Sequence, residues 1–114
     1  MADCIFCKIA NGEIPSTKVY EDEHVLAFRD IHPRAPKHVV IIPKHHVQNL
    51  NEIDQLTEAE QLALLHACKK TAALAGIEVS GYRIASNCGP DADQSVQHLH
   101  FHVLGGGKLS VNMA

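Results

Sequence analysis

The sequence predicts an α+β protein: a five-stranded antiparallel sheet with one long helix and a short N-terminal helix. Three observations support this class, namely five short β-rich runs, a single long helical pattern and a short helical pattern at the front. The chain has 114 residues and no internal repeat or Pro/Gly/Ser-rich linker. It is therefore expected to form a single domain spanning residues 1–114.

The first third of the chain has the pattern of a short helix followed by a hairpin. Apolar residues at helical spacing predict a helix over Cys4–Ala10, which Asn11 and Gly12 end. β-Rich runs then predict two strands, Lys18–Glu21 and Val25–Arg29, joined by a short polar turn. These two strands are expected to pair with each other.

The middle of the chain contains a central strand and the long helix. The run His38–Lys44 is β-branched and almost continuously apolar, as in a strand buried on both faces, and Pro43 ends it. Thr57 and Glu60 form a capping box, and the helical pattern that follows continues to Gly76. The apolar positions that continue this pattern are Leu62, Leu65, Ala72 and Leu74.

Two more strands, Tyr82–Ser86 and His98–Leu104, complete the sheet, with the polar loop GPDADQS between them. In the last strand His98, His100 and His102 alternate with apolar residues, so the three imidazoles share one face at spacings of about 6.5 to 7 Å. A polar strand face normally meets water, but three titratable groups in register indicate phosphate chemistry or a metal site. A single tetrahedral ion would need distortion to reach all three.

Composition excludes several functional classes. The net charge is −3, the sequence pI is near 6.3 and the basic residues are scattered, so we expect no nucleic acid polymer as a partner. No stretch approaches the roughly 20 apolar residues of a membrane span, and no signal peptide pattern is present, so we expect a cytoplasmic protein without a membrane partner. The four cysteines are then expected to be thiols or metal ligands, although Cys4 and Cys7 could form a redox pair.

Three segments of the chain resemble the histidine triad (HIT) superfamily of nucleotide hydrolases and transferases. The run from His98 to Leu104 matches its signature His-φ-His-φ-His-φ-φ, in which φ is hydrophobic. The matching segments, which together cover nearly the whole chain, are CIFCKIANGEIP, LAFRDIHPRAPKHVVIIPKHH and QSVQHLHFHVLGG. They are most similar to the Hint branch, the purine nucleoside phosphoramidases. The resemblance implies a HIT-like fold.

The resemblance also implies a reaction. A purine nucleoside 5′-phosphoramidate, adenosine being the expected nucleoside, is cleaved through a covalent nucleotidyl-histidine, which water hydrolyses to release AMP. His100 matches the nucleophile, His102 the hydrogen-bond donor to the phosphate, and His98 a residue that supports the row. Ser95 matches a residue that touches the phosphate and passes a proton to the leaving nitrogen. Catalysis requires no cofactor.

Matching positions imply how the nucleotide is held. Asn87 and the backbone amides of Asp93, Gln94 and Ser95 would bind phosphate, and Asp30 would bind the ribose hydroxyls. Many relatives have Gly at the position of Asp93, whose charge would disfavour highly anionic substrates. The alternative role of these polar residues is to form turns or cap the backbone, and that of the apolar residues named next is to pack in the core. The apolar residues that resemble the purine pocket are Ile5, Phe6, Ile9, Ile14, Phe28 and Ile31.

Some relatives bind zinc through four residues that match Cys4, Cys7, His46 and His98, a sound structural zinc set. Zinc there would tie the first helix to the sheet, and the redox pair is the alternative. Members of this branch form homodimers, which would protect an edge strand.

Two other functions stay open, a hydrolase of diadenosine polyphosphates and a nucleotide-binding interaction module with incidental activity. The histidine at position 102 argues against the nucleotidylyltransferase branch, which has Gln there.

Overall fold

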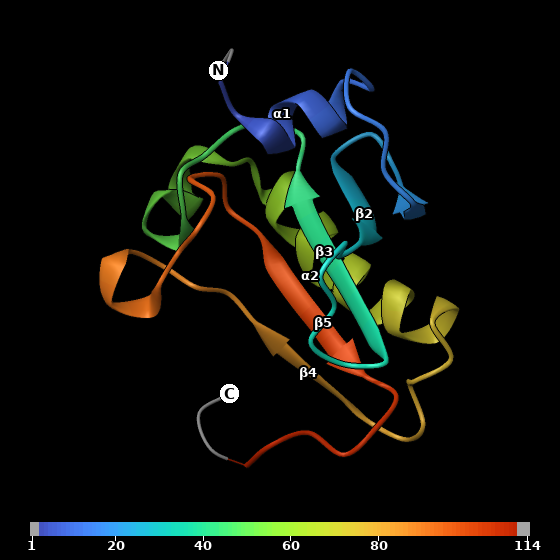
Figure 1. The fold of residues 1–114 in the computed structure, drawn as a ribbon. Coiled ribbons are helices and arrows are strands. Elements are labelled where there is room, and N and C mark those ends of the chain that lie inside the picture. The colour runs from blue at the N-terminus through green and yellow to red at the C-terminus, as the bar shows by residue number, and fades with distance from the viewer. Residues whose placement is uncertain (1–2, 112–114) are drawn as a thin grey trace.

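The computed structural model describes residues 3–111 and contains a five-stranded antiparallel sheet in the order β1-β2-β3-β5-β4 (Figure 1). The predicted fold class is therefore confirmed. The strands are β1 (Lys18–Glu21), β2 (Val25–Arg29), β3 (Lys37–Pro43), β4 (Tyr82–Ala85) and β5 (Phe101–Gly105). The helices are α1 (Ile5–Ala10) and α2 (Glu58–Leu74), with two 3₁₀ helices, η1 (Leu50–Gln55) and η2 (Pro90–Ala92), that the sequence pattern does not predict.

The first helix and hairpin form where their local signals place them. The Cys4 side chain caps α1 by accepting from the Cys7 amide, and Asn11 ends it. Strands β1 and β2 have the predicted bounds, and the Asp22 carboxylate closes their turn by accepting the amides of His24 and Val25. The hairpin thus depends on contacts between near neighbours in the sequence.

The strand predicted to be central lies in the middle of the sheet. β3 pairs with β2 on one side and with β5 on the other, and six of its seven residues are buried. Its continuous apolar pattern follows from this double coverage.

The last strand begins later than predicted. The prediction places a strand over His98–Leu104, whereas β5 begins at Phe101, and β4 ends one residue early, at Ala85. The ladder to β3 stops at the pair formed by Ile41 and Phe101. Beyond this pair, the Pro43 carbonyl accepts from the His98 ring at 2.8 Å. Of the three histidines, only His102 lies in the ladder.

Helix α2 has the predicted capping box but buries a different face. Thr57 accepts from the Glu60 amide, and the Glu60 side chain accepts from the Thr57 amide. Of the four residues that define the predicted apolar pattern, Ala72 is buried, whereas Leu62, Leu65 and Leu74 are exposed by 56, 61 and 62%. The residues of the helix that are buried are mostly small, which allows close approach to the sheet, and they are Leu64, Ala67, Cys68, Thr71 and Ala72.

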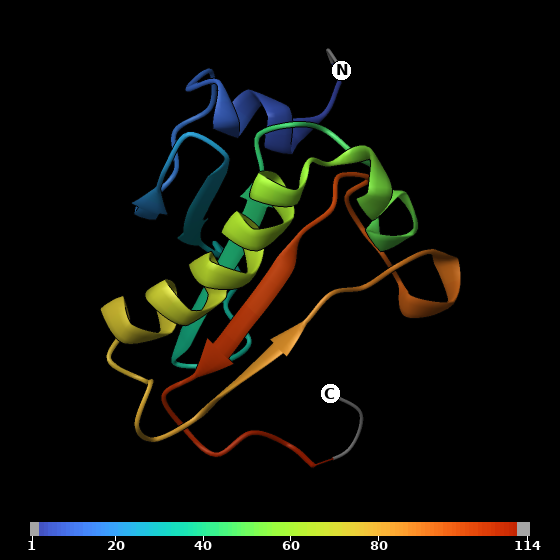
Figure 2. The same ribbon diagram turned by 180° about the vertical axis from the view of Figure 1, so that it is seen from behind.

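The two faces of the sheet have different covers. Helix α2 packs across one face, with Val39, Ile41 and Val103 beneath it (Figure 2). On the opposite face, side chains of α1 pack on Val40 and Ile42. Because α1 is short, it covers only one end of that face, toward which Figure 1 looks. No helix among residues 3–111 has the length and apolar character needed to span a membrane.

Candidate active site and metal centre

The catalytic candidates lie on the sheet face opposite α2. His102 is paired with Val40 of β3, and side chains alternate between the faces along each strand. The same alternation places His38 on this face beside His102, and the segment that leads into β5 brings His100 next to it, with 5.0 Å between the ring centroids of His100 and His102. The buried histidines therefore form a continuous row.

The proton of His100 is fixed by a backbone carbonyl. His100 Nδ1 lies 2.7 Å from the carbonyl oxygen of His98, and because a carbonyl can only accept, Nδ1 must carry the proton. The lone pair of the neutral ring is therefore on Nε2. Burial lowers the pKa of His100, which keeps the ring neutral near pH 7. A neutral, oriented imidazole nitrogen is a competent nucleophile.

His38 orients His102 in the same way, and sequence reasoning missed it. The Arg34 backbone amide donates to His38 Nδ1 at 3.1 Å, so the His38 proton is on Nε2. His38 Nε2 then donates to His102 Nδ1 at 2.8 Å, which leaves the His102 proton on Nε2. His102 thus has the donor expected for a phosphate oxygen. The one available signal was a histidine in the otherwise apolar run of β3.

Burial also keeps these two rings neutral. It lowers the pKa of His102 to about 4, and the neighbouring charges of His100 and His38 act in the same direction. Burial lowers the pKa of His38 as well, although Asp30 opposes the shift. The row therefore holds neutral rings whose donors and acceptors are set by hydrogen bonds.

Asp30 lies at the end of the row, beside His38. Its carboxylate approaches His38 Nε2 at 3.5 Å and accepts the His32 amide at 2.8 Å. It follows β2 directly, and its amide donates to the His38 carbonyl at 3.1 Å. The carboxylate is partly exposed, so solvent-side hydroxyl groups could reach it.

The apolar candidates for the purine pocket gather beside the nucleophile. Phe6 packs edge-on against Phe28, with centroids 5.6 Å apart, and against His100 at 5.1 Å. Ile9 belongs to the same cluster. Ile31 does not pack there, since it is 86% exposed. Phe6, Phe28 and Ile9 are thus at least in part core residues, whereas Ile31 is free to contact a ligand.

Two of the three amides expected to bind phosphate have acceptors within the loop. The Asp93 amide donates to Pro90 and the Gln94 amide to Gly89, because η2 closes a tight turn with Asp93 at φ 58°. These two amides are therefore engaged within the loop. Of the three expected amides, only that of Ser95 donates to no acceptor within residues 3–111.

The Gln94 side chain is also part of the scaffold. It is buried, its oxygen accepts the Gly89 amide at 2.9 Å, and its nitrogen donates to the carbonyls of Gln48 and Val96. The bond to Gln48 ties the loop to the segment before η1, and the bonds to Gly89 and Val96 hold the loop's own shape. Its contribution to a nucleotide site is to position the loop.

Asn87 and Ser95 line different cavities. Asn87 borders one of about 320 Å³ together with His38 and His102. Ser95 borders one of about 700 Å³ together with Cys4 and His46. His102 of the triad lines the first cavity, whereas no triad residue lines the second.

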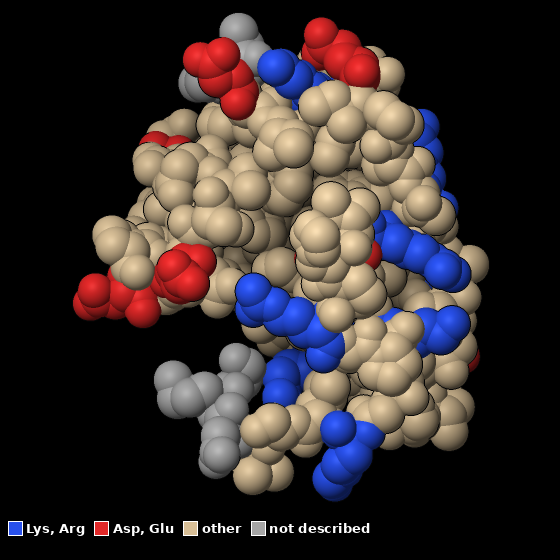
Figure 3. Space-filling view, viewed as in Figure 1, with Lys and Arg blue, Asp and Glu red and all other residues tan. Residues whose placement is uncertain are grey.

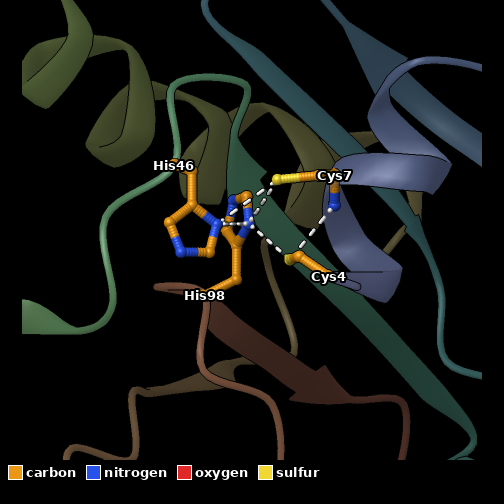
Figure 4. A group of neighbouring side chains, drawn as sticks. All are labelled: Cys4, Cys7, His46 and His98. Atoms are coloured by element: carbon orange, nitrogen blue, oxygen red, sulfur yellow. Dashed lines mark hydrogen bonds between the residues drawn. The ribbon is translucent and has the colours of Figure 1, made fainter. Parts of the chain in front are cut away.

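Cys4, Cys7, His46 and His98 converge behind this row (Figure 4). His98 Nδ1 lies 3.3 Å from Cys4 Sγ, 3.6 Å from Cys7 Sγ and 3.0 Å from His46 Nδ1. Cys7 Sγ and His46 Nδ1 are 3.3 Å apart. Burial, with the Cys4 thiol beside it, raises the pKa of Cys7 to about 11.

This donor set fits a zinc ion. Tetrahedral zinc with nitrogen ligands near 2.1 Å and sulfur ligands near 2.3 Å requires ligand atoms about 3.4 to 3.8 Å apart, and the four atoms here lie within 4.8 Å of one another. His98 Nε2 donates to the Pro43 carbonyl at 2.8 Å, so Nδ1 presents its lone pair to the cluster. The His98 ring is fully buried and has both nitrogens engaged, so the carbonyl of His98, and not its ring, contacts His100.

Comparisons with known proteins agree with this geometry. The HIT domain family model matches residues 11–109. A histidine triad protein from Clostridium difficile is 49% identical with a TM-score of 0.86, covering 96% of each chain. A HIT family hydrolase from Legionella pneumophila is 42% identical, with a TM-score of 0.86, covering 96% of this chain and 98% of its own. The 14 kDa zinc-binding protein of Zea mays is 47% identical over 112 residues, 93% of this chain and 84% of that protein.

The fold and the histidine row are those of a histidine triad domain. This chain belongs to the HIT domain family.

Proposed function

We propose that this protein hydrolyses purine nucleoside 5′-phosphoramidates at the α-phosphorus, through a nucleotide bound covalently to His100. The observation that carries the proposal is the 2.7 Å contact between His100 Nδ1 and the His98 carbonyl, which leaves Nε2 unprotonated. The family resemblance and the neighbour described as a HIT family hydrolase support the reaction class.

In the first step His100 Nε2 attacks phosphorus, the P–N bond to the leaving group breaks, and the amine takes up a proton. The positive charge that develops on the His100 ring is stabilised by the His98 carbonyl, because Nδ1–H already donates to it. The Nε2–H of His102 stabilises the phosphoryl oxygens. Ser95, by its resemblance, delivers the proton to the leaving nitrogen. Water then attacks the same phosphorus, the bond to His100 breaks and AMP is released.

The nucleoside is held on the open sheet face. Asp30 accepts from the ribose hydroxyls, and the base packs against Phe6 and Phe28, with Ile31 covering it. The direct contact of Phe6 with His100 places this apolar cluster one ring away from the nucleophile.

His100→Ala tests the mechanism. We expect loss of adenosine phosphoramidate hydrolysis, at least about 10³-fold, with AMP affinity changed less than threefold, because nucleophile and scaffold are separable. His66→Ala, on the exposed face of α2, is the matched control. Acid-quenched wild-type enzyme should carry a nucleotide on His100, and full turnover by His100→Ala would refute the mechanism.

One comparison of rates separates the proposed function from its two alternatives, a diadenosine polyphosphate hydrolase and a nucleotide-binding interaction module. Faster turnover of a diadenosine polyphosphate than of the phosphoramidate, at equal concentration, would favour the polyphosphate hydrolase. AMP binding without turnover of either compound would favour the interaction module.

We further propose that Cys4, Cys7, His46 and His98 bind a structural zinc ion. The ligand spacing and the zinc-binding relative from Zea mays support this assignment. The ion would supply no catalytic chemistry, and these four residues would tie α1 and the segment after β3 to the segment that carries His100.

A homodimer is proposed as the assembly, with α2 and the edge strand β4 facing a second copy. Leu62 and Leu65 on α2 and Ile84 on β4 are all more than 40% exposed, and the outer edge of β4 has no partner strand among residues 3–111. Sedimentation velocity should show a dimer that Leu65→Glu converts to a monomer, whereas Val79→Glu, at another exposed apolar site, should not. A wild-type monomer would refute the assembly.

A further inference from the structure

The cavity beside His102 contains two arginines that the proposed reaction does not use. It measures about 320 Å³ and opens on the side of the histidine row away from the Cys/His cluster. The residues that matter for its chemistry are Arg34, Arg83, Asn87, His102, Leu104 and Leu109.

The strand register and the loop position place both arginines at this cavity. Arg83 of β4 is paired with Leu104 of β5, so its side chain lies on the same sheet face as Leu104 and His102. Arg34 lies in the loop before β3, and its charge is near enough to lower the pKa of both His38 and His102. The two side chains thus approach the cavity from different elements.

Neither guanidinium has a partner within residues 3–111. Neither forms a side-chain hydrogen bond there, and no carboxylate lies within 4.0 Å of either one. Two cations with free donors at one cavity attract an anion, because each guanidinium can donate two parallel hydrogen bonds to a carboxylate or phosphate.

The surrounding surface has opposite charges on its two sides. In Figure 3, Lys and Arg side chains lie on one side of a hollow, and Asp and Glu side chains lie on the other. Asp93, expected to repel anionic substrates, does not line the arginine cavity. An anion is therefore favoured on the side of the hollow where Lys and Arg side chains lie.

We propose that Arg34 and Arg83 form a subsite for a second anionic group, a carboxylate or phosphate carried by the leaving group of the substrate. The proposal rests on the proposed function, which places the transferred phosphate at His100 and His102. The cavity begins at His102 and Asn87, so a group attached to that phosphate can extend into it. Leu104 and Leu109 provide an apolar wall for a short spacer between the phosphorus and the anion.

The test compares substrates that differ only in this anion. The adenosine 5′-phosphoramidate of β-alanine carries a carboxylate, its methyl ester is neutral, and the phosphoramidate of phosphoethanolamine carries a phosphate. The ratio of kcat/KM for each anionic compound to that of the ester isolates the subsite. For the wild-type enzyme this ratio should be about 10 or more for one of the two anionic compounds. The compound that gives the high ratio shows whether the subsite binds a carboxylate or a phosphate.

Arg34→Gln and Arg83→Gln should each lower that ratio about tenfold. Lys69→Gln removes one charge from the opposite side of the molecule and should leave it unchanged. A wild-type ratio near one for both anions, or equal losses on the ester and the acids, would overturn the subsite. Equal losses would mean that the arginines bind the transferred phosphate.

Binding to His100→Ala separates this proposal from the proposed function. Calorimetry on this variant should show the favoured acid binding about tenfold more tightly than the ester, and adding Arg83→Gln should abolish the difference. If the acid binds more tightly than the ester but the wild-type enzyme hydrolyses neither compound, the subsite is supported and the proposed reaction is refuted. Equal binding of acid and ester would refute the subsite whether or not the enzyme is active.

Discussion

His38 Nε2 lies 2.8 Å from His102 Nδ1, and this contact decides which nitrogen of His102 carries the proton. The Arg34 amide fixes His38, His38 fixes His102, and His102 presents an N–H toward the open face. A phosphate oxygen would meet a donor that is oriented before the substrate arrives.

Loss of His38 should therefore reduce catalysis more than binding. We expect His38→Leu to lower kcat about 100-fold with AMP affinity within threefold, because the His102 proton is no longer held on Nε2. His38→Gln keeps a donor near the position of Nε2 and should recover at least tenfold of the loss. Equal kcat for the two variants, at comparable stability, would mean that His38 is only a packing residue.

The depressed pKa of His102 predicts a stability loss in acid. The folded state keeps this ring neutral down to about pH 4, whereas the unfolded state takes up a proton below about 6.5. Its contribution to stability is therefore full above pH 6.5 and is lost as the pH falls toward 4.

His102→Asn keeps an acceptor for His38 but cannot take up a proton. Between pH 7.5 and pH 5, the free energy of unfolding measured in urea should fall by about 2 kcal/mol more for the wild-type protein than for this variant. His66→Asn should follow the wild-type profile. Parallel profiles for wild type and His102→Asn would show that His102 does not contribute to the acid sensitivity.

Zinc removal should destabilise the protein. Purified protein should contain about one zinc ion per chain, and chelation should lower Tm by roughly 10 °C, because an ion bound only by the folded state stabilises it. Cys7→Ser should lose the metal, whereas Cys88→Ser, a half-buried thiol outside the cluster, should keep it. Metal-free protein with reduced cysteines and an unchanged Tm would refute the site.

Gln94→Leu should loosen the phosphate loop. The change leaves the Gly89 amide and the carbonyls of Gln48 and Val96 without their partner. We expect the free energy of unfolding to fall by about 2 to 3 kcal/mol and AMP affinity to fall with it. Gln55→Leu, at an exposed position of η1, is the control. Unchanged AMP affinity would show that the loop does not bind the nucleotide.

Features set by near neighbours were predictable from the sequence. The hairpin and the capping box of Thr57 and Glu60 appear where expected, because each depends on residues a few positions apart. The predicted start of β5 was wrong because a strand begins where its pairing begins. The pairing between β3 and β5 ends at Ile41 and Phe101, before it reaches Pro43. The buried face of α2 was misassigned because small residues, not leucines, make most of its contact with the sheet.

The candidate site shows the same division. The triad was visible as a motif, the Cys/His set was implied by the family resemblance, and the structure brings each set together. The importance of His38 was not visible, because its partner lies 64 positions away and the pairing comes from sheet register. The engagement of the Asp93 and Gln94 amides depends on the turn that η2 makes.

The His100 ring is oriented by the main chain of residue 98, not by the side chain of that residue. A peptide carbonyl is present whichever amino acid occupies the position, so evolution can replace the imidazole of His98 without removing the acceptor that His100 needs. Loss of the His98 imidazole, together with any metal ion that it holds, would therefore leave the hydrogen bond to His100 in place. What orients His100 is the path of the backbone between Gln97 and Phe101.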